Sequence, residues 1–434
     1  MPFNLEGAGH WYRLAGLPEP HHSDPPLLVA SGADVAETVA WCNARLADLG
    51  SGWRVEPEDG PATRPVVTAL VVRRPELSLP DEPVLSVSDV LALLKLRTGP
   101  SPWPGPVLAV GSFGFDNPGP KPGAVRQTGP LPELAALVGG PLGRIPVTAS
   151  LPPPARRPLS ALPGGRRPVV ALLDTAVDPH APGRPAPWLG DPDPGPDGVW
   201  ADAGQYGWQR GPARLRPPET ASFRSMPKCF GHGTFSAGLI RQVAPDARIL
   251  SVPVVDDDGT THIDQLINAF GWLHEQRTAD PTFVDVVCCP ITVTANLPDD
   301  ALVLGWLRAV LGALGGAGVP VVVPAGNDGS PVPTFPGAFT ALSVAGTPDV
   351  PVVTVGALNP DGSDAYYSNH GDWVQVRRPG SALISLMPVW DGDEQPPVRG
   401  SAGVGVDPDA FRGWARWSGT SFACALHAGE LAAL

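Results

Sequence analysis

The stretch that decides the fold is Pro168-Val-Val-Ala-Leu-Leu-Asp174, a short apolar run that ends in an acid. Similar apolar runs follow at 248–255, 283–290, 319–324 and 352–357. Hydrophobic residues follow one another in these runs without alternation, as in strands buried on both faces of a parallel sheet. Helical patterns separate several of the runs, at 232–243, 262–278 and 299–315. We therefore predict an α/β domain whose ligands bind at the carboxyl ends of its strands.

Proline and arginine dominate the segment before this run, residues 149–167, which includes Arg156-Arg157 and Arg166-Arg167. Proline-rich composition favours extended polyproline geometry, so we predict a linker there. We interpret the tandem arginines as solvated charges or as processing points. The domain that follows the linker is expected to span residues 168–434.

Residues 1–148 have a different pattern. Apolar runs at 66–72 and 107–111 are mixed with helical patterns at 34–49 and 87–96. This mixture predicts a smaller α+β N-terminal domain, of an accessory or prodomain-like kind. We expect it to bind the second domain or a regulatory partner.

The composition is that of a folded, acidic protein. Gly and Pro account for 51 and 57 of the 434 residues, but 43% of the residues are hydrophobic and 13 are Trp. These apolar residues are enough for a sizeable core. The net charge of −13 argues against a nucleic-acid partner, because clustered basic residues supply the affinity for phosphate backbones.

The cysteine count and the apolar segments indicate the cellular compartment in which the protein is expected. Five Cys, an odd number, do not indicate a disulfide framework, and this favours a reducing compartment. The first ten residues lack the basic and apolar parts of a secretory signal. Glycines and Pro320 interrupt the most apolar stretch, 309–325, so no membrane span is predicted. We expect a soluble, cytoplasmic protein with no membrane partner.

Three polar residues stand at the ends of predicted elements. Asp174 follows the first strand, His232 lies in Gly231-His-Gly-Thr-Phe-Ser-Ala-Gly, and Ser421 lies in Ser418-Gly-Thr-Ser-Phe-Ala-Cys-Ala. A serine hydroxyl is a weak nucleophile that needs an adjacent base, and the base needs an orienting acceptor. Each residue alone is also typical of a turn, a loop or a helix cap. Their order of Asp, His and Ser favours nucleophilic catalysis.

These segments resemble the signature segments of the subtilisin-like serine peptidases, over about residues 168–434. Pro324-Ala-Gly-Asn327-Asp-Gly is similar to the oxyanion-hole segment of that family. The resemblance implies a subtilisin-like three-layer fold with a mostly parallel central sheet. It also implies a serine endopeptidase that forms an acyl-enzyme on Ser421. His232 would be the base, Asp174 its orienting acid and Asn327 an oxyanion donor, with no cofactor required.

The chain departs from the family pattern at several positions. Phe235-Ser236 and Ala425-Leu426 stand beside the His and Ser segments, and we expect them to change packing without touching the reacting groups. Cys288-Cys289-Pro290-Ile291-Thr292 replaces the strand end that pairs with a substrate backbone. Pro290, Ile291, Thr292 and Gly326 are the predicted substrate-binding residues. Because Pro290 has no N–H, we expect restricted specificity among intracellular protein or peptide substrates.

Other interpretations stay open at this point. The main alternative is a catalytically silent protease-fold interaction module. Autocleavage near residues 151–167 is a further expectation. The sequence ends soon after Ser421, which indicates either a truncated C-terminus or a fold that closes with fewer helices.

Two side-chain groups near the predicted site have alternative interpretations. Asp191, Asp193, Asp197 and Asp202 allow a structural calcium ion, but interleaved prolines spoil the usual loop pattern, so no metal site is predicted. Cys229 and Cys424 each lie three residues from His232 or Ser421. We interpret them as buried packing residues or as redox-sensitive thiols.

Overall fold

The computed structural model describes part of the chain, and every structural statement below concerns that part. The described residues are 27–30, 35–48, 54–57, 67–73, 108–110, 144–148, 151–179, 188–189, 201–206, 208, 229–255, 261, 263–293, 300–340, 350–390 and 411–434.

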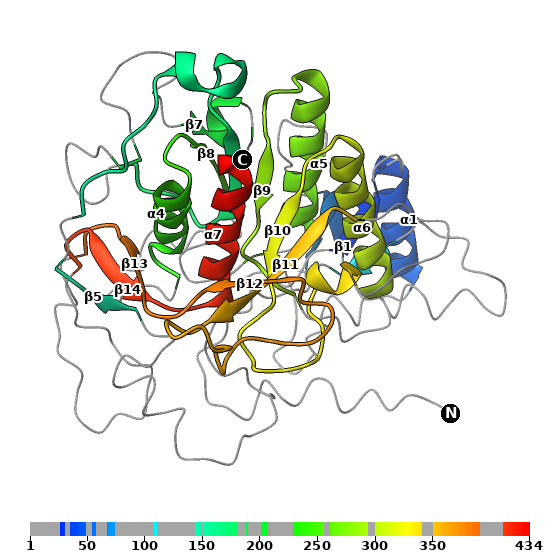
Figure 1. Ribbon diagram of the computed structural model, residues 1–434. Coiled ribbons are helices and arrows are strands. Elements are labelled where there is room, and N and C mark those ends of the chain that lie inside the picture. The colour runs from blue at the N-terminus through cyan, green and yellow to red at the C-terminus, as the bar shows by residue number, and fades with distance from the viewer. Residues whose placement is uncertain are drawn as a thin grey trace.

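Parallel strands form the central sheet, in the order β12-β11-β10-β9-β6-β8-β7 (Figure 1). The strands are β6 (Val169–Asp174), β7 (Ala201–Asp202), β8 (Arg248–Pro253), β9 (Val286–Cys288), β10 (Val321–Pro324), β11 (Val352–Leu358) and β12 (Val376–Pro379). Each apolar run predicted from the sequence coincides with one of the five central strands, and β11 extends one residue beyond its run. The two edge strands, β7 and β12, are short and lie outside these apolar runs.

Alternate residues of a central strand face opposite sides of the sheet. In β6, Val170 and Leu172 belong to one buried apolar cluster, whereas Ala171 and Leu173 belong to another. Because both faces of the strand are buried, its sequence is hydrophobic up to Asp174 and does not alternate between polar and apolar residues. The predicted α/β architecture is therefore confirmed.

Helices cover both faces and complete three layers (Figure 1). They are α4 (His232–Val243) and α7 (Thr420–Ala433) on one face, and α5 (Ile263–Ala279) and α6 (Asp300–Gly316) on the other. Phe235 and Phe422 anchor the first pair in its cluster, and Phe270 and Leu311 anchor the second. The helices expected at 232–243, 262–278 and 299–315 are confirmed to within one residue. None of the described helices is long and apolar enough to cross a bilayer.

A second, antiparallel sheet lies beside α4. It contains β13 (Leu383–Leu386), β14 (Trp414–Trp417) and β5 (Ile145–Pro146), in the order β13-β14-β5 (Figure 1). In β5, Ile145 pairs with Arg416 and Pro146 pairs with Ala415. Arg144 adds a hydrogen bond to the carbonyl of Phe230 and lies over the Trp417 ring. A strand from residues 1–148 thus belongs to a sheet of the second domain.

The described part of residues 1–148 also forms a sheet of its own. Its order is β2-β3-β1-β4, with the helix α1 (Val35–Asp48). The strands are β1 (Leu27–Ala30), β2 (Arg54–Pro57), β3 (Val67–Arg73) and β4 (Leu108–Val110). These elements confirm the predicted mixture of helix and strand, while the helix expected at 87–96 lies outside the described residues. The domain boundaries at 148 and 167 stay a prediction.

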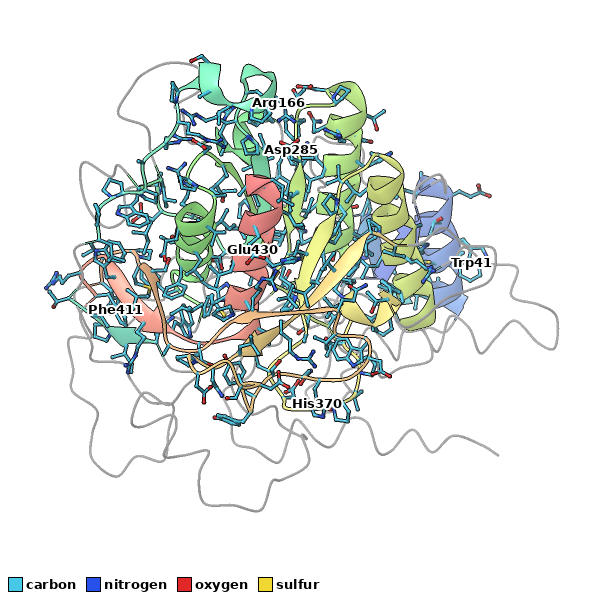
Figure 2. The ribbon with its side chains drawn as sticks, in the orientation of Figure 1. Trp41, Arg166, Asp285, His370, Phe411 and Glu430 are labelled. Atoms are coloured by element: carbon cyan, nitrogen blue, oxygen red, sulfur yellow. The ribbon has the colours of Figure 1, made fainter. Side chains whose placement is uncertain are left out.

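The segment 151–167 lies against the second domain. Asp246 accepts hydrogen bonds from the backbone and guanidinium of Arg157 and from Arg167. Arg166 binds both carboxylate oxygens of Asp285 (Figure 2). Two short 3-10 turns, at Leu159–Ala161 and Pro163–Gly165, interrupt the extended geometry that was expected, and Leu162 between them is buried. All three arginines are ion-paired, but the side chains of Arg157 and Arg166 stay 57% and 41% exposed. Only Arg167, with its side chain 9% exposed, contradicts the interpretation as a solvated charge.

Candidate active site

The three predicted catalytic residues lie where β6 ends and where α4 and α7 begin. Asp174 is the last residue of β6, His232 is the first of α4, and Ser421 is the second of α7. Gly233 lets α4 approach the end of β6, because a side chain there would overlap the backbone carbonyl of Thr175. This carboxyl edge is where open α/β sheets bind their ligands.

Asp174 and His232 form a buried pair. The Nδ1 atom of His232 lies 2.7 Å from Oδ1 and 2.8 Å from Oδ2 of Asp174. Asp174 is 0% exposed and His232 is 5% exposed. Since a carboxylate only accepts hydrogen bonds, Nδ1 carries the proton and Nε2 is left as the basic nitrogen. The backbone N–H of Thr175 also donates to Oδ1, at 2.6 Å, which offsets part of the desolvation of the carboxylate.

Ser421 comes directly before a residue that contacts the imidazole of His232. The ring of the next residue, Phe422, has its centroid 5.1 Å from that of His232. Ser421 is buried and its hydroxyl donates to the carbonyl of Pro290, at 3.2 Å. The N-terminus of α7 favours negative charge at this position. The structure thus pairs Asp174 with His232 and places Phe422, next to Ser421, against the imidazole, while the catalytic role of the three residues stays a prediction.

Asn327 follows β10 and is held by the first residue of α7. Its Oδ1 accepts hydrogen bonds from the backbone N–H and from the hydroxyl of Thr420, each at 2.9 Å. The hydroxyl of Thr420 in turn accepts from the backbone N–H of Gly326, at 3.2 Å. With its oxygen bound in this way, the amide of Asn327 has its Nδ2 group left to donate elsewhere. Gly326 has φ +102°, and a side chain there would overlap the amide of Asn369.

The predicted substrate-binding residues after β9 are buried. Pro290 presents its carbonyl to Ser421, and Ile291 and Thr292 are 1% and 3% exposed. Ile291 packs in the core cluster of the α5 and α6 face. The side chain of Ile291 therefore contributes to packing, and the substrate-binding role of this segment stays a prediction.

Ser236 contacts the site, contrary to the expectation from the sequence. Its hydroxyl donates to Oδ2 of Asp174, at 3.1 Å, and the residue is 0% exposed. The expectation that Phe235-Ser236 changes packing alone is therefore wrong for Ser236. One signal was available: Ser236 lies four residues after His232 on a predicted helix, so the two share a face. Thr175 and Thr420 were also missed, although each adjoins a predicted catalytic residue.

The cysteines near the site are packed in the interior. All five cysteines are free and buried. The sulfur of Cys424 lies 3.8 Å from that of Cys288 and donates to the carbonyl of Val322. Burial raises the pKa of the Cys424 and Cys289 thiols well above the ordinary value. These thiols stay protonated at neutral pH, which favours the interpretation as packing residues over redox sensors.

The possible metal ligands fall mostly outside the described residues. Asp191, Asp193 and Asp197 are not described, and Asp202 is the second residue of β7. Among the described side chains, no group of three or more His, Cys, Asp or Glu is arranged to hold a metal ion. The calcium hypothesis therefore stays untested.

Comparison with known protein families gives one match that covers most of the chain. A family model described as the subtilase family matches residues 165–434. The match includes the candidate residues Asp174, His232, Asn327 and Ser421, and it agrees with the parallel sheet and three layers described above. The predicted subtilisin-like fold is therefore confirmed.

Individual relatives match a smaller part of the chain. Mycosin-4 of Mycobacterium tuberculosis is 30% identical over 192 residues, which cover 38% of this chain and 41% of that protein. Subtilisin E of Bacillus subtilis is 27% identical over 188 residues, 41% of this chain and 44% of that protein. The chain thus spans less than half the length of these relatives.

Two solved structures are also similar to this chain over part of its length. One is described as a cold adapted subtilisin-like serine proteinase, with a TM-score of 0.38, 19% identity, and coverage of 60% of this chain and 72% of that chain. The other is described as a lanthipeptide protease, with a TM-score of 0.42, 19% identity, and coverage of 60% and 71%.

Proposed function

Because the chain belongs to the subtilase family, we propose that it is a serine endopeptidase that hydrolyses peptide bonds through an acyl-enzyme on Ser421. The observation that carries this proposal is the buried Asp174–His232 pair beside the N-terminus of α7. The pair supplies the oriented base that a serine nucleophile needs.

In this mechanism Ser421 attacks the carbonyl carbon of the scissile bond while His232 Nε2 accepts the hydroxyl proton. His232 then gives that proton to the leaving amine, which departs as the acyl-enzyme forms. Asp174 keeps the proton of the neutral imidazole on Nδ1 and stabilises the imidazolium. Water repeats the sequence on the acyl-enzyme and releases the acid product. The proposed chemistry uses protein groups alone and needs no cofactor.

The tetrahedral intermediate carries a negative oxygen that must be stabilised. We assign this role to the Nδ2 group of Asn327 and to the backbone N–H of Ser421. Thr420 supports the assignment, because it binds the Asn327 oxygen and so fixes which end of the amide can donate. Donors fixed in advance stabilise developing charge without reorganising during the reaction.

Labelling with a fluorophosphonate serine probe tests the proposal. We expect the wild-type protein to be labelled and the Ser421→Ala and His232→Ala variants to stay unlabelled. Ser363→Ala, at an exposed turn, is the matched control and should label like the wild type. A folded wild type that takes no label would overturn the proposal and favour the catalytically silent interaction module.

We further propose that the enzyme accepts a restricted set of intracellular protein or peptide substrates. Pro290 supports this, because it contributes a carbonyl beside Ser421 but no N–H to a substrate strand. Profiling with a mixture of peptides of random sequence is the direct test. We expect cleavage in a narrow set of sequences, and efficient cleavage of unfolded casein at many sites would contradict the proposal.

We also propose a cytoplasmic location. The support is chemical: the five cysteines are free and buried, so none contributes a disulfide. Fractionation of cells that express the full-length protein checks the location. Recovery in a secreted or membrane fraction would contradict it.

A role in regulation is proposed for residues 1–148, which we expect to bind the catalytic domain or a regulatory partner. The pairing of β5 with β14 supports the first of these two expectations, since β14 leads into α7 and Ser421. Crosslinking of the full chain, read by mass spectrometry, should link residues 1–143 to the catalytic domain. If every crosslink joined two residues within 1–143, the proposal that this region binds the catalytic domain of the same chain would be contradicted.

A further inference from the structure

The carboxylate of Asp174 has an unequal set of donors on its two oxygens. Oδ1 accepts from the Thr175 backbone N–H at 2.6 Å and from His232 at 2.7 Å. Oδ2 is 2.8 Å from the same His232 nitrogen and accepts from the Ser236 hydroxyl at 3.1 Å. Among the described residues, two groups therefore donate to Oδ2: the ring nitrogen of His232 and the hydroxyl of Ser236.

Ser236 is placed for this contact by the helix that begins at His232. It lies four residues later in α4, so its side chain is on the same face as the imidazole. Serine hydroxyls inside helices often bond back to a backbone carbonyl one turn earlier. Here the hydroxyl instead donates to a carboxylate at the end of β6.

Other contacts already fix the backbone at this junction. The backbone N–H of Gly233 donates to the hydroxyl of Thr175, and that of Asp178 donates to the hydroxyl of Thr234. These two hydrogen bonds hold α4 against the chain that follows β6. Ser236 differs from them because it touches the carboxylate itself, which can rotate about its own bond while the backbone stays in place.

We infer that Ser236 is a positioning residue for catalysis: its hydroxyl holds the Asp174 carboxylate in the plane that aligns His232, and it draws part of the negative charge away from the imidazole. The inference rests on the proposed function, since it assigns a role in the same proton transfer. It predicts two separable effects of removing the hydroxyl, one on the rate and one on its pH dependence.

The rate falls because a loosely held carboxylate leaves His232 less well oriented. A hydrogen bond to a charged group in a buried site typically corresponds to about a tenfold effect on an equilibrium or rate. The pH dependence changes because Oδ2 then bears more negative charge, which favours the protonated imidazole. The acid limb of the pH–rate profile moves to higher pH as a result.

The neighbouring titratable groups do not offer another source for such a pH shift. Besides His232, the groups that act electrostatically with Asp174 include the thiols of Cys289, after β9, and Cys424, in α7. Burial raises the pKa of both thiols well above the ordinary value, so they stay neutral at neutral pH. Cys288 lies against Cys424 in the same buried group.

A matched pair of variants separates the hydroxyl from packing. Ser236→Thr keeps the hydroxyl and adds a methyl group, while Ser236→Val has nearly the same volume and has no hydroxyl. Ser236→Ala removes the hydroxyl without adding volume. The readout is the second-order rate of reaction with a fluorophosphonate probe from pH 5 to 9, per folded molecule, with melting temperature measured in parallel.

We expect Ser236→Ala and Ser236→Val to react about tenfold more slowly than Ser236→Thr, with their acid limbs moved to higher pH. A purely structural role would lower the melting temperature and leave the rate per folded molecule and the acid limb unchanged. That result would overturn the inference, as would equal rates and acid limbs in the Thr and Val variants. The proposed function fails separately, if wild type does not react or if Ser421→Ala reacts equally well.

Discussion

Thr420 gives both of its donors to one atom of Asn327: its backbone N–H and its hydroxyl each lie 2.9 Å from Oδ1. Because both hydrogen bonds hold the amide oxygen, the orientation of the amide is fixed. Its Nδ2 group then points away from Thr420 and can donate to another acceptor. The residue before the proposed nucleophile thereby orients the proposed oxyanion donor. This relationship makes two predictions about the transition state.

The first prediction concerns Asn327 itself. Asn327→Ala removes the side-chain donor, and we expect kcat to fall about 100- to 1000-fold because the oxyanion loses one preorganised hydrogen bond. The KM should change little, since the donor acts mainly on the intermediate. Steady-state kinetics on a cleaved peptide measures both constants. A large rise in KM at constant kcat would instead place Asn327 in ground-state binding.

The second prediction concerns the hydroxyl of Thr420. Thr420→Val removes one of the two donors to Asn327 and keeps the shape of the side chain, so we expect a loss in kcat of about tenfold. Thr420→Ser retains the hydroxyl and serves as the matched control, with activity close to that of the wild type. If the Val and Ser variants were equally active, the hydroxyl would have no part in orienting the amide.

The third prediction concerns the tautomer of His232. Asp174→Asn keeps the size of the side chain but can donate a proton to Nδ1, which leaves the imidazole with the wrong nitrogen protonated. We expect kcat to fall about 10,000-fold, as this substitution does in another serine protease fold. Circular dichroism should show an unchanged fold. Activity within tenfold of wild type would argue against Asp174 as the orienting acid.

The fourth prediction concerns stability in acid. Asp285 binds Arg166 through two hydrogen bonds, at 2.7 and 2.5 Å, and accepts the backbone N–H of Val169, at 2.8 Å. Burial opposes its ionisation, but these hydrogen bonds and the charge of Arg166 outweigh burial and lower the pKa of Asp285. Because the folded pKa lies below the unfolded value of about 3.9, the stabilisation is present above that value and is lost as pH falls through the folded pKa.

We therefore expect Asp285→Asn to lower the melting temperature at pH 7, and the difference from wild type to shrink as the pH falls below about 4. Thermal unfolding between pH 2.5 and 7 measures this difference. Asp372→Asn, at an exposed carboxylate, is the control and should differ little from wild type at any pH. A difference for Asp285→Asn that stays constant with pH would contradict the role of its charge.

The central sheet could be predicted from the sequence because its strands are buried on both faces. The run from Val169 to Asp174 has no polar residue before its end, so its pattern identified it. The helix from His232 to Val243 was predicted with its observed bounds, since small residues open it and an apolar face follows. Local pattern was enough for both elements.

Other features depend on distant partners and could not be predicted. Strand β5 has two residues, one of them Pro146, and it exists because the edge of β14 is available for pairing. The hydroxyl of Ser236 had several possible acceptors, and only the approach of α4 to β6 selects Asp174. Arg157 and Arg167 similarly meet at Asp246, far away in the sequence.

The position of β5 has a practical consequence for anyone who wishes to produce the catalytic unit alone. Composition suggests starting a fragment at residue 149, but such a fragment would lack Ile145 and Pro146 and would leave the edge of β14 open. An open strand edge is a template for intermolecular pairing and aggregation. A fragment that begins at Arg144 would carry its own edge strand, together with the arginine that covers Trp417.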